Sequence, residues 1–133
     1  MFEWKPEYSV QIPAIDAQHK RLFALASELH SAMSQGKGKG VLEKGLTRLV
    51  DYTKEHFKDE EKFMGSFNYP ELVAHKGLHD QLTARVTDFQ KRFALQEACL
   101  TIDLMEFLQD WLAHHINGSD QKYSAHLRAK KTP

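Results

Sequence analysis

Apolar residues recur every three or four positions along most of the chain, as they do on one face of an α-helix. Leu22, Ala26 and Leu29 show this spacing, and the same repeat returns in later segments. Glycine, proline and asparagine gather between the repeats, where they favour turns over helices. The pattern predicts four long helices and a short fifth one, over residues 17–35, 40–64, 70–94, 100–116 and 120–129.

Residues that cap or break helices predict where these helices begin and end. Asp16 is expected to be the N-cap of the first helix. Pro70 occupies a favoured first-turn position at the start of the third. Asn117 and Gly118 are expected to end the fourth helix. Residues 1–15 are expected to form an arm that packs on the outside of the helices.

The arrangement of the helices follows from the short segments between them. No stretch alternates apolar and polar residues with a period of two, so strands are not expected. Short connections make consecutive helices antiparallel neighbours. We therefore expect an all-α fold: an antiparallel up-down-up-down four-helix bundle with an N-terminal arm and a short C-terminal helix. The whole chain is expected to be one domain, with the arm at 1–15, the bundle at about 16–118 and a tail at 119–133.

Composition and charge exclude several classes of function. The 133 residues include 18 basic and 18 acidic side chains, so the formal net charge is zero. Such a chain has no positive field that would collect nucleic acid or an anionic membrane surface. Its longest apolar run, Leu22 to Ala26, is far shorter than the roughly 20 residues that span a bilayer. Cys99 is the only cysteine, so no internal disulfide can form, and a cytoplasmic location is expected.

Eight histidines stand out in this otherwise ordinary composition. His56 and Glu60 lie four residues apart, and so do His75 and His79. Four residues are about one helical turn, so each pair projects from one helix face. Each pair is therefore able to chelate a metal ion.

His115 and Asp120 have a different spacing. They are five residues apart, which on a straight α-helix would separate them by about 140° around the axis. A helix end at Gly118 is expected to let the chain turn and bring Asp120 back toward His115.

Helix direction brings these residues together. In an up-down-up-down bundle, the starts of the first and third helices lie beside the ends of the second and fourth. The candidate ligands all fall within about two turns, or about 11 Å, of that end. One layer is therefore expected to contain His19, His56, Glu60, His75, His79, His115 and Asp120. Buried there without a metal ion, these groups would cost several kcal/mol of desolvation.

The donor types limit the choice of metal. Imidazole and carboxylate suit iron, manganese or zinc, and four-helix cores commonly hold two-metal sites, with iron favoured. Five imidazoles, two bridging carboxylates and a bridging oxide or hydroxide leave one position open on two six-coordinate ions. Within this layer no chelating partner is expected for the other histidines, His30, His114 and His126, which are expected at the surface or behind the ligands. Asp59 and Glu61 are expected to face water.

A family resemblance extends along nearly the whole chain and rests on Ile15-Asp-Ala-Gln-His-Lys20, His56-Phe-Lys-Asp-Glu-Glu61, His75-Lys-Gly-Leu-His79 and Trp111-Leu-Ala-His-His-Ile116, followed by Asp120 and Tyr123. With these motifs the chain resembles the hemerythrins, most closely the bacterial ones, the bacteriohemerythrins. The resemblance implies reversible binding of dioxygen for transport, storage or delivery. It also implies two iron ions (Fe2+/Fe3+) with a bridging oxide or hydroxide.

The resemblance also implies a role for each residue. One iron would be held by His75, His79 and His115. The other, which keeps the open position, would be held by His19 and His56. The carboxylates that bridge the two ions would be Glu60 and Asp120. Trp111, Leu112 and Ile116 are expected to line the gas site, and as ordinary core residues they would look the same.

Two other functions are alternatives: a module that senses O2, NO or redox state, and a di-iron enzyme that consumes peroxide or nitric oxide. The sequence offers no general acid or second-substrate site beyond the metal layer. We therefore expect a binding protein rather than an enzyme. Dioxygen is its expected ligand, and an O2-consuming protein is a candidate partner.

Overall fold

The computed structural model describes residues 4–95 and 102–131 as helices joined by short turns. This all-α fold confirms the predicted class, and no strand occurs within those two ranges. The helices are α1 (Pro13–Ser34), α2 (Lys39–Ser66), α3 (Leu72–Ala94), α4 (Ile102–His114) and α5 (Gln121–Lys131), with a 3-10 turn, η1, at Pro6–Tyr8 and a π-helical turn, η2, at His115–Asp120. None of the described helices combines the length and apolarity needed to cross a membrane.

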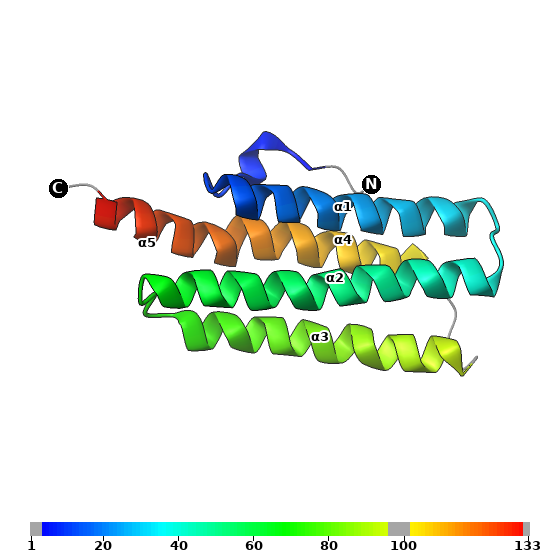
Figure 1. Cartoon of the computed structure of the whole chain (residues 1–133). Coiled ribbons are helices and arrows are strands. Elements are labelled where there is room, and N and C mark those ends of the chain that lie inside the picture. The colour runs from blue at the N-terminus through cyan, green and yellow to red at the C-terminus, as the bar shows by residue number, and fades with distance from the viewer. Residues whose placement is uncertain (1–3, 96–101, 132–133) are drawn as a thin grey trace.

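The helices form four roughly parallel rods, as the bundle prediction requires (Figure 1). α1, α2 and α3 are three of them and alternate in direction along the chain. The fourth rod is α4, η2 and α5 taken together. The first residues of α1 and α3 therefore lie at the same end of the bundle as the last turns of α2 and the junction of α4 with α5.

The predicted helix end at Asn117 and Gly118 is wrong. The rod continues through this segment as the π-helical turn η2. A π-helix closes its hydrogen bonds five residues apart, so it takes in an extra residue without breaking the helix. Buried side chains on both sides, Ile116 and Tyr123, fix the rod to the core, and glycine permits a break but does not force one.

Two predicted helix starts also shift. α1 begins at Pro13, with proline in the first turn, so Asp16 lies inside the helix and is not its N-cap. The Asp16 carboxylate instead accepts hydrogen bonds from the arm, from the Val10 N–H at 2.8 Å and from the Ser9 hydroxyl. α3 begins at Leu72, two residues after the predicted proline start.

The arm is tied to the last helix as well as to the first. The Gln121 side-chain amide donates to the Ser9 carbonyl at 2.9 Å, and the Ser124 hydroxyl donates to the Val10 carbonyl at 2.6 Å. Tyr8 stacks on Phe23 of α1 with ring centroids 5.6 Å apart. The arm therefore joins the beginning of α1 to the beginning of α5.

The Ser124→Ala variant is expected to lose about 1–3 kcal/mol of unfolding free energy, because the buried Val10 carbonyl loses its donor. Urea denaturation followed by circular dichroism measures the loss. Ser66→Ala is the matched control, since the Ser66 hydroxyl makes only an exposed bond to the Phe63 carbonyl. Equal losses in the two variants would contradict the role of the arm contact.

Apolar side chains fill the bundle on both sides of one polar layer. The larger cluster includes Leu22, Leu29 and Val50, and the smaller one contains Met64, Tyr69 and Tyr123. Along α2 and α3 the candidate metal ligands fall between residues of these two clusters. On the fourth rod, His115 and Asp120 follow Leu112 of the larger cluster and precede Tyr123 of the smaller one. The core therefore encloses the polar layer and keeps it from water.

Candidate metal centre

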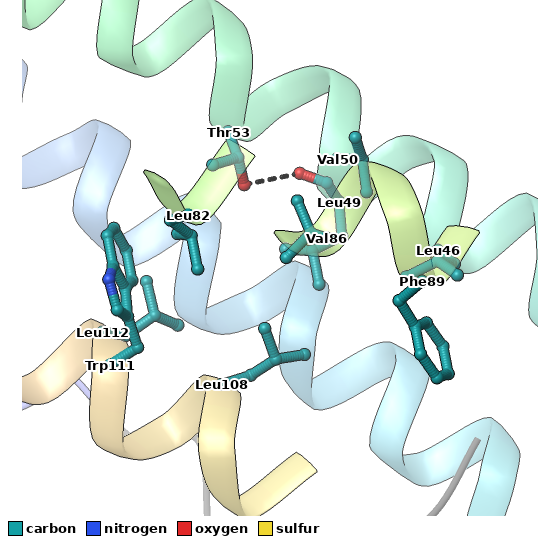
Figure 2. Close-up of a pocket in the computed structure, with 10 residues that line it drawn as sticks. All are labelled: Leu46, Leu49, Val50, Thr53, Leu82, Val86, Phe89, Leu108, Trp111 and Leu112. Atoms are coloured by element: carbon teal, nitrogen blue, oxygen red, sulfur yellow. Dashed lines mark hydrogen bonds between the residues drawn. The ribbon is translucent and has the colours of Figure 1, made fainter. Parts of the chain in front are cut away.

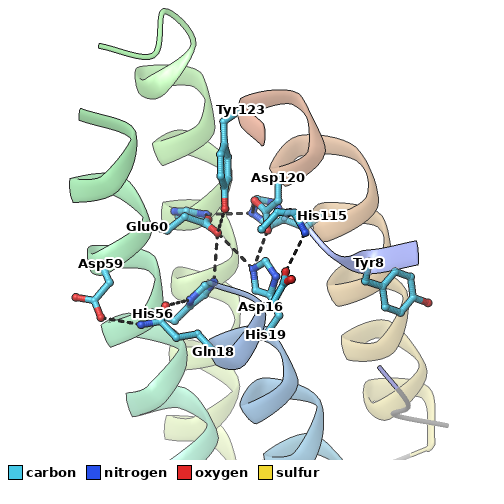
Figure 3. A network of polar contacts seen from close by, with 12 residues as sticks. Tyr8, Asp16, Gln18, His19, His56, Asp59, Glu60, His115, Asp120 and Tyr123 are labelled. Carbon is cyan, nitrogen blue, oxygen red and sulfur yellow. Dashed lines mark hydrogen bonds and ion pairs between the residues drawn. The ribbon is translucent and has the colours of Figure 1, made fainter. Parts of the chain in front are cut away.

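Seven polar side chains are buried together in this layer. Figure 3 labels His19, His56, Glu60, His115 and Asp120 among them. Glu60 and Asp120 are fully buried, with no exposed surface, and none of the five histidines is more than 7% exposed. The set is the one expected from the sequence: His19 on α1; His56 and Glu60 on α2; His75 and His79 on α3; His115 and Asp120 on η2.

The π-helical turn brings the last two residues together. Residues five apart are hydrogen-bonded neighbours in a π-helix, so they lie on the same face. In a regular α-helix they would lie on different faces. The ring Nε2 of His115 lies 3.2 Å from Asp120 Oδ1. The convergence that we expected from a helix end at Gly118 is thus achieved by a wider helical turn.

Each carboxylate divides its two oxygens between two groups of histidines. Glu60 Oε1 lies 3.0 Å from His79 Nε2 and 3.2 Å from His75 Nε2. Glu60 Oε2 faces the other way, at 3.3 Å from His19 Nε2 and 3.5 Å from His56 Nε2. This is the arrangement of a carboxylate that bridges two cations, each held by its own histidines.

Asp120 repeats the division. Its Oδ1 lies 2.9 Å from His75 Nε2 and 3.2 Å from His115 Nε2, whereas its Oδ2 lies 3.1 Å from His19 Nε2. All five histidines therefore present Nε2 to the centre of the layer. The donor atoms form two groups, each within 4.8 Å, that share Glu60: one of five residues and one of three.

Several atoms of the layer lack the partners that burial demands. Both Asp120 oxygens and both His19 ring nitrogens are buried without a well-aligned hydrogen bond. The Nε2 atoms of His79 and His115 face one another at 3.0 Å, although two neutral ring nitrogens with lone pairs would repel. Unpaired buried polar groups cost about 1–3 kcal/mol each. Metal cations between these donors would satisfy the Asp120 oxygens and every Nε2 atom that faces the centre, so the residues fit a two-metal site. Only the outer Nδ1 of His19 would gain nothing from them.

Protonation follows from the mutual contacts in the layer. Burial lowers the pKa of His19 and of His75, but contacts with Asp120 and Glu60 outweigh burial and raise both pKa values to about 9. Burial alone would raise the pKa of Glu60, but its four histidine contacts lower it well below the usual range. The carboxylates are therefore ionised, and protons compete with metal for the histidines.

Metal affinity is expected to rise with pH up to about pH 9. Below that pH, His19 and His75 of metal-free protein are protonated and must release about two protons to bind a cation. Titration calorimetry in two buffers of different ionisation enthalpy measures this release. The same protonated histidines stabilise metal-free protein fully below their unfolded pKa of about 6.5, and that stabilisation is lost as the pH rises through about 9. An affinity independent of pH would contradict the ligand set.

Comparison with known proteins agrees with this geometry. The family model for the hemerythrin HHE cation binding domain matches residues 10–127. The chain belongs to the hemerythrin family. Among similar hemerythrins, the bacteriohemerythrin of Methylococcus capsulatus is 36% identical, over 92% of this chain and 93% of that relative. The one from Stenotrophomonas maltophilia is 34% identical, over 95% and 81%. A crystal structure of wild-type hemerythrin superposes with a TM-score of 0.88, at 35% identity over 92% of this chain and 95% of the other.

Outside the donor layer of this hemerythrin, polar residues hold the rings of two histidines. The Gln18 Oε1 atom accepts from His56 Nδ1 at 2.6 Å, and the Gln18 amide donates to Asp59 Oδ2 at 3.0 Å (Figure 3). The Glu61 carboxylate accepts from His79 Nδ1 at 2.9 Å. The expectation that Glu61 faces water is therefore wrong, because its side chain is only 21% exposed and reaches across to α3.

Aromatic contacts also orient the candidate ligands. Phe57 lies flat on His79 with centroids 3.8 Å apart, and Trp111 lies flat on His115 at 4.6 Å. The Tyr123 hydroxyl donates to Glu60 Oε2 at 2.9 Å. Neither Gln18 nor Phe57 could be singled out from the sequence, since neither residue type signals a metal site.

The three residues expected to line the gas site separate into two groups. Trp111 and Leu112 border an apolar cavity of about 30 Å³ between α2, α3 and α4, which continues along the core to Phe89 (Figure 2). Ile116 is buried in the core and does not border that cavity.

The remaining histidines lie outside the donor groups. His114, next to His115, points outward, and its Nδ1 bonds to the Asp110 carbonyl of its own helix at 2.8 Å. His126 packs against Phe67 and Tyr69.

Proposed function

We propose that this protein binds dioxygen reversibly at a non-haem di-iron centre and serves in O2 transport, storage or delivery. The proposal rests mainly on the two carboxylates. Glu60 and Asp120 each direct one oxygen to the first group of histidines and the other oxygen to the second group. The curated relatives bear the name bacteriohemerythrin, which supports the same function. Iron at such a centre supplies reversible electron transfer to the gas.

The ligand assignment is part of the proposal. His75, His79 and His115 would hold one iron, and His19 and His56 the other, with Glu60 and Asp120 as bridges. The iron with two histidines would have one protein ligand fewer, so it would keep the open position for the gas. A bridging oxide or hydroxide would complete the pair.

The surrounding side chains would keep bound gas from water. Leu112 and Ile116 are buried beside the layer, and Trp111 covers the ring of His115. Burial and the charge of Glu60 hold the pKa of Tyr123 well above its usual range, so its hydroxyl stays protonated and keeps donating to Glu60. Exclusion of bulk water is what would let the gas leave unchanged, since protons drive the irreversible oxidation of such sites.

The test is an absorption spectrum with an iron assay. Protein purified in air should contain about two irons per chain, and its visible absorption should bleach when oxygen is removed and return with air. An irreversible change in the first cycle would contradict the proposal. Sustained turnover of peroxide or nitric oxide would favour a di-iron enzyme instead. An O2-consuming partner and a cytoplasmic location stay predictions.

A further inference from the structure

The outer nitrogens of the candidate ligands meet unequal partners. His79 Nδ1 contacts the Glu61 carboxylate at 2.9 Å. His56 Nδ1 contacts the neutral amide oxygen of Gln18 at 2.6 Å. His19 Nδ1 is buried and has no hydrogen-bond partner among the described residues. The three-histidine position thus has a ligand backed by an anion, whereas the two-histidine position has one backed by an amide and one with no such support.

Both of these contacts fix the same tautomer. A carboxylate only accepts, so His79 must carry its proton on Nδ1 and keep the Nε2 lone pair free. The Gln18 amide is oriented by its donation to Asp59, so its oxygen faces His56 and selects the same tautomer there. An anionic partner also makes the opposite ring nitrogen a stronger donor, and loss of such a partner typically costs about 10–100-fold in metal affinity.

The three-histidine position also has more donor atoms already gathered than the two-histidine position. Five residues, including both carboxylates, lie with their donor atoms within 4.8 Å of one another at the three-histidine position. Only His19, His56 and Glu60 do so at the other. Less reorganisation is needed where more donors already converge, so less binding free energy is lost there.

We propose that the two metal positions fill in order, the three-histidine position first, and that Glu61 is the positioning residue that sets this order by holding His79. The inference rests on the two-metal site of the proposed function. The first ion would fix Glu60 Oε1 and Asp120 Oδ1, and thereby aim Glu60 Oε2 and Asp120 Oδ2 at His19. The second position would be completed by binding at the first.

The experiment follows metal loss from the loaded protein. Ferrous protein is dialysed without oxygen against buffers of decreasing free Fe2+, and iron per chain is measured at each step. Two separate steps are expected, with a one-iron form between them. Glu61→Gln should weaken the tighter step about 10–100-fold, which would bring the two steps together, and Glu61→Asp should restore their separation.

Asp59→Asn is the matched control. Asp59 flanks Glu60 on the other side in the same helix, carries the same charge and contacts Gln18 instead of a ligand. It should leave the tighter step within about threefold of its original affinity and act on the weaker step through Gln18 and His56. Circular dichroism of each variant verifies folding.

Three results would overturn the inference. The first is loss of both ions in a single step, and the second is an equal effect of Glu61→Gln on both steps. The third is that Asp59→Asn weakens the tighter step as much as Glu61→Gln does. Failure of the proposed function would look different. The protein would then lose its irons in two steps but would not bleach and recover with oxygen.

Discussion

Replacing Glu60 with alanine is expected to lower the iron content from about two per chain to nearly none. Glu60 directs one oxygen to each group of histidines, so under the proposed assignment its removal would take a ligand from both ions at once. The loss should exceed the roughly 100-fold drop in affinity that follows from removing an outer partner. The fully buried histidines would also lose their anion, which typically costs about 3–5 kcal/mol of stability. Iron analysis and thermal unfolding measure the two effects.

Asp59→Ala is the control for Glu60→Ala. It removes a carboxylate from the neighbouring position of the same helix, but that side chain is exposed and touches Gln18 instead of the donor layer. Because Asp59 acts on one position only, through Gln18 and His56, this variant should keep at least one iron per chain, whereas Glu60→Ala should keep almost none. A Glu60→Ala protein that retains two irons would rule out the bridging assignment.

The second large effect is a difference in iron content between alanine variants of two adjacent histidines, His115 and His114. His115→Ala should lose most of the iron at the three-histidine position, since its Nε2 lies 3.2 Å from Asp120 and 3.0 Å from His79 Nε2. His114→Ala should keep about two irons, because its ring faces outward and bonds only to the Asp110 carbonyl in its own helix. The expected difference is at least about 100-fold in affinity for the first ion.

Iron assays and absorption spectra of the two variants, which differ by one position, measure this difference. Because both substitutions replace histidine with alanine in the same rod, effects on helix propensity cancel to within a few tenths of a kcal/mol. Equal iron loss in the two variants, or greater loss in His114→Ala, would show that the ligand on η2 is misassigned.

The helical period alone determined which residues share a face. His56 with Glu60, and His75 with His79, are one turn apart, and any helix through those segments presents each pair together. Short connections fixed the antiparallel order, which in turn placed all the candidate ligands at one end. These features depend on local geometry, so the sequence was sufficient for them.

Local geometry was not sufficient for η2. Asn117 and Gly118 have the composition of a helix end, and a break there also explained how Asp120 could return to His115. The rod continues because buried residues on either side hold both halves against the bundle, and a π-helical turn satisfies the backbone where a break would not. Contacts with the other helices therefore decide between a helix end and a π-helical turn, and the sequence of the rod alone does not reveal those contacts.

The outer contacts were likewise decided by the tertiary structure. Glu61 reads in the sequence as a solvated neighbour of Glu60, yet it reaches α3 and holds His79. Gln18 and Asp59 meet across 41 positions of the chain, and the arm meets α5 across more than 110. The sequence by itself therefore determined the helices, their order and the seven converging residues. Only the fold decided the shape of η2 and the partners of each histidine, because those depend on distances between helices and not on the period within one.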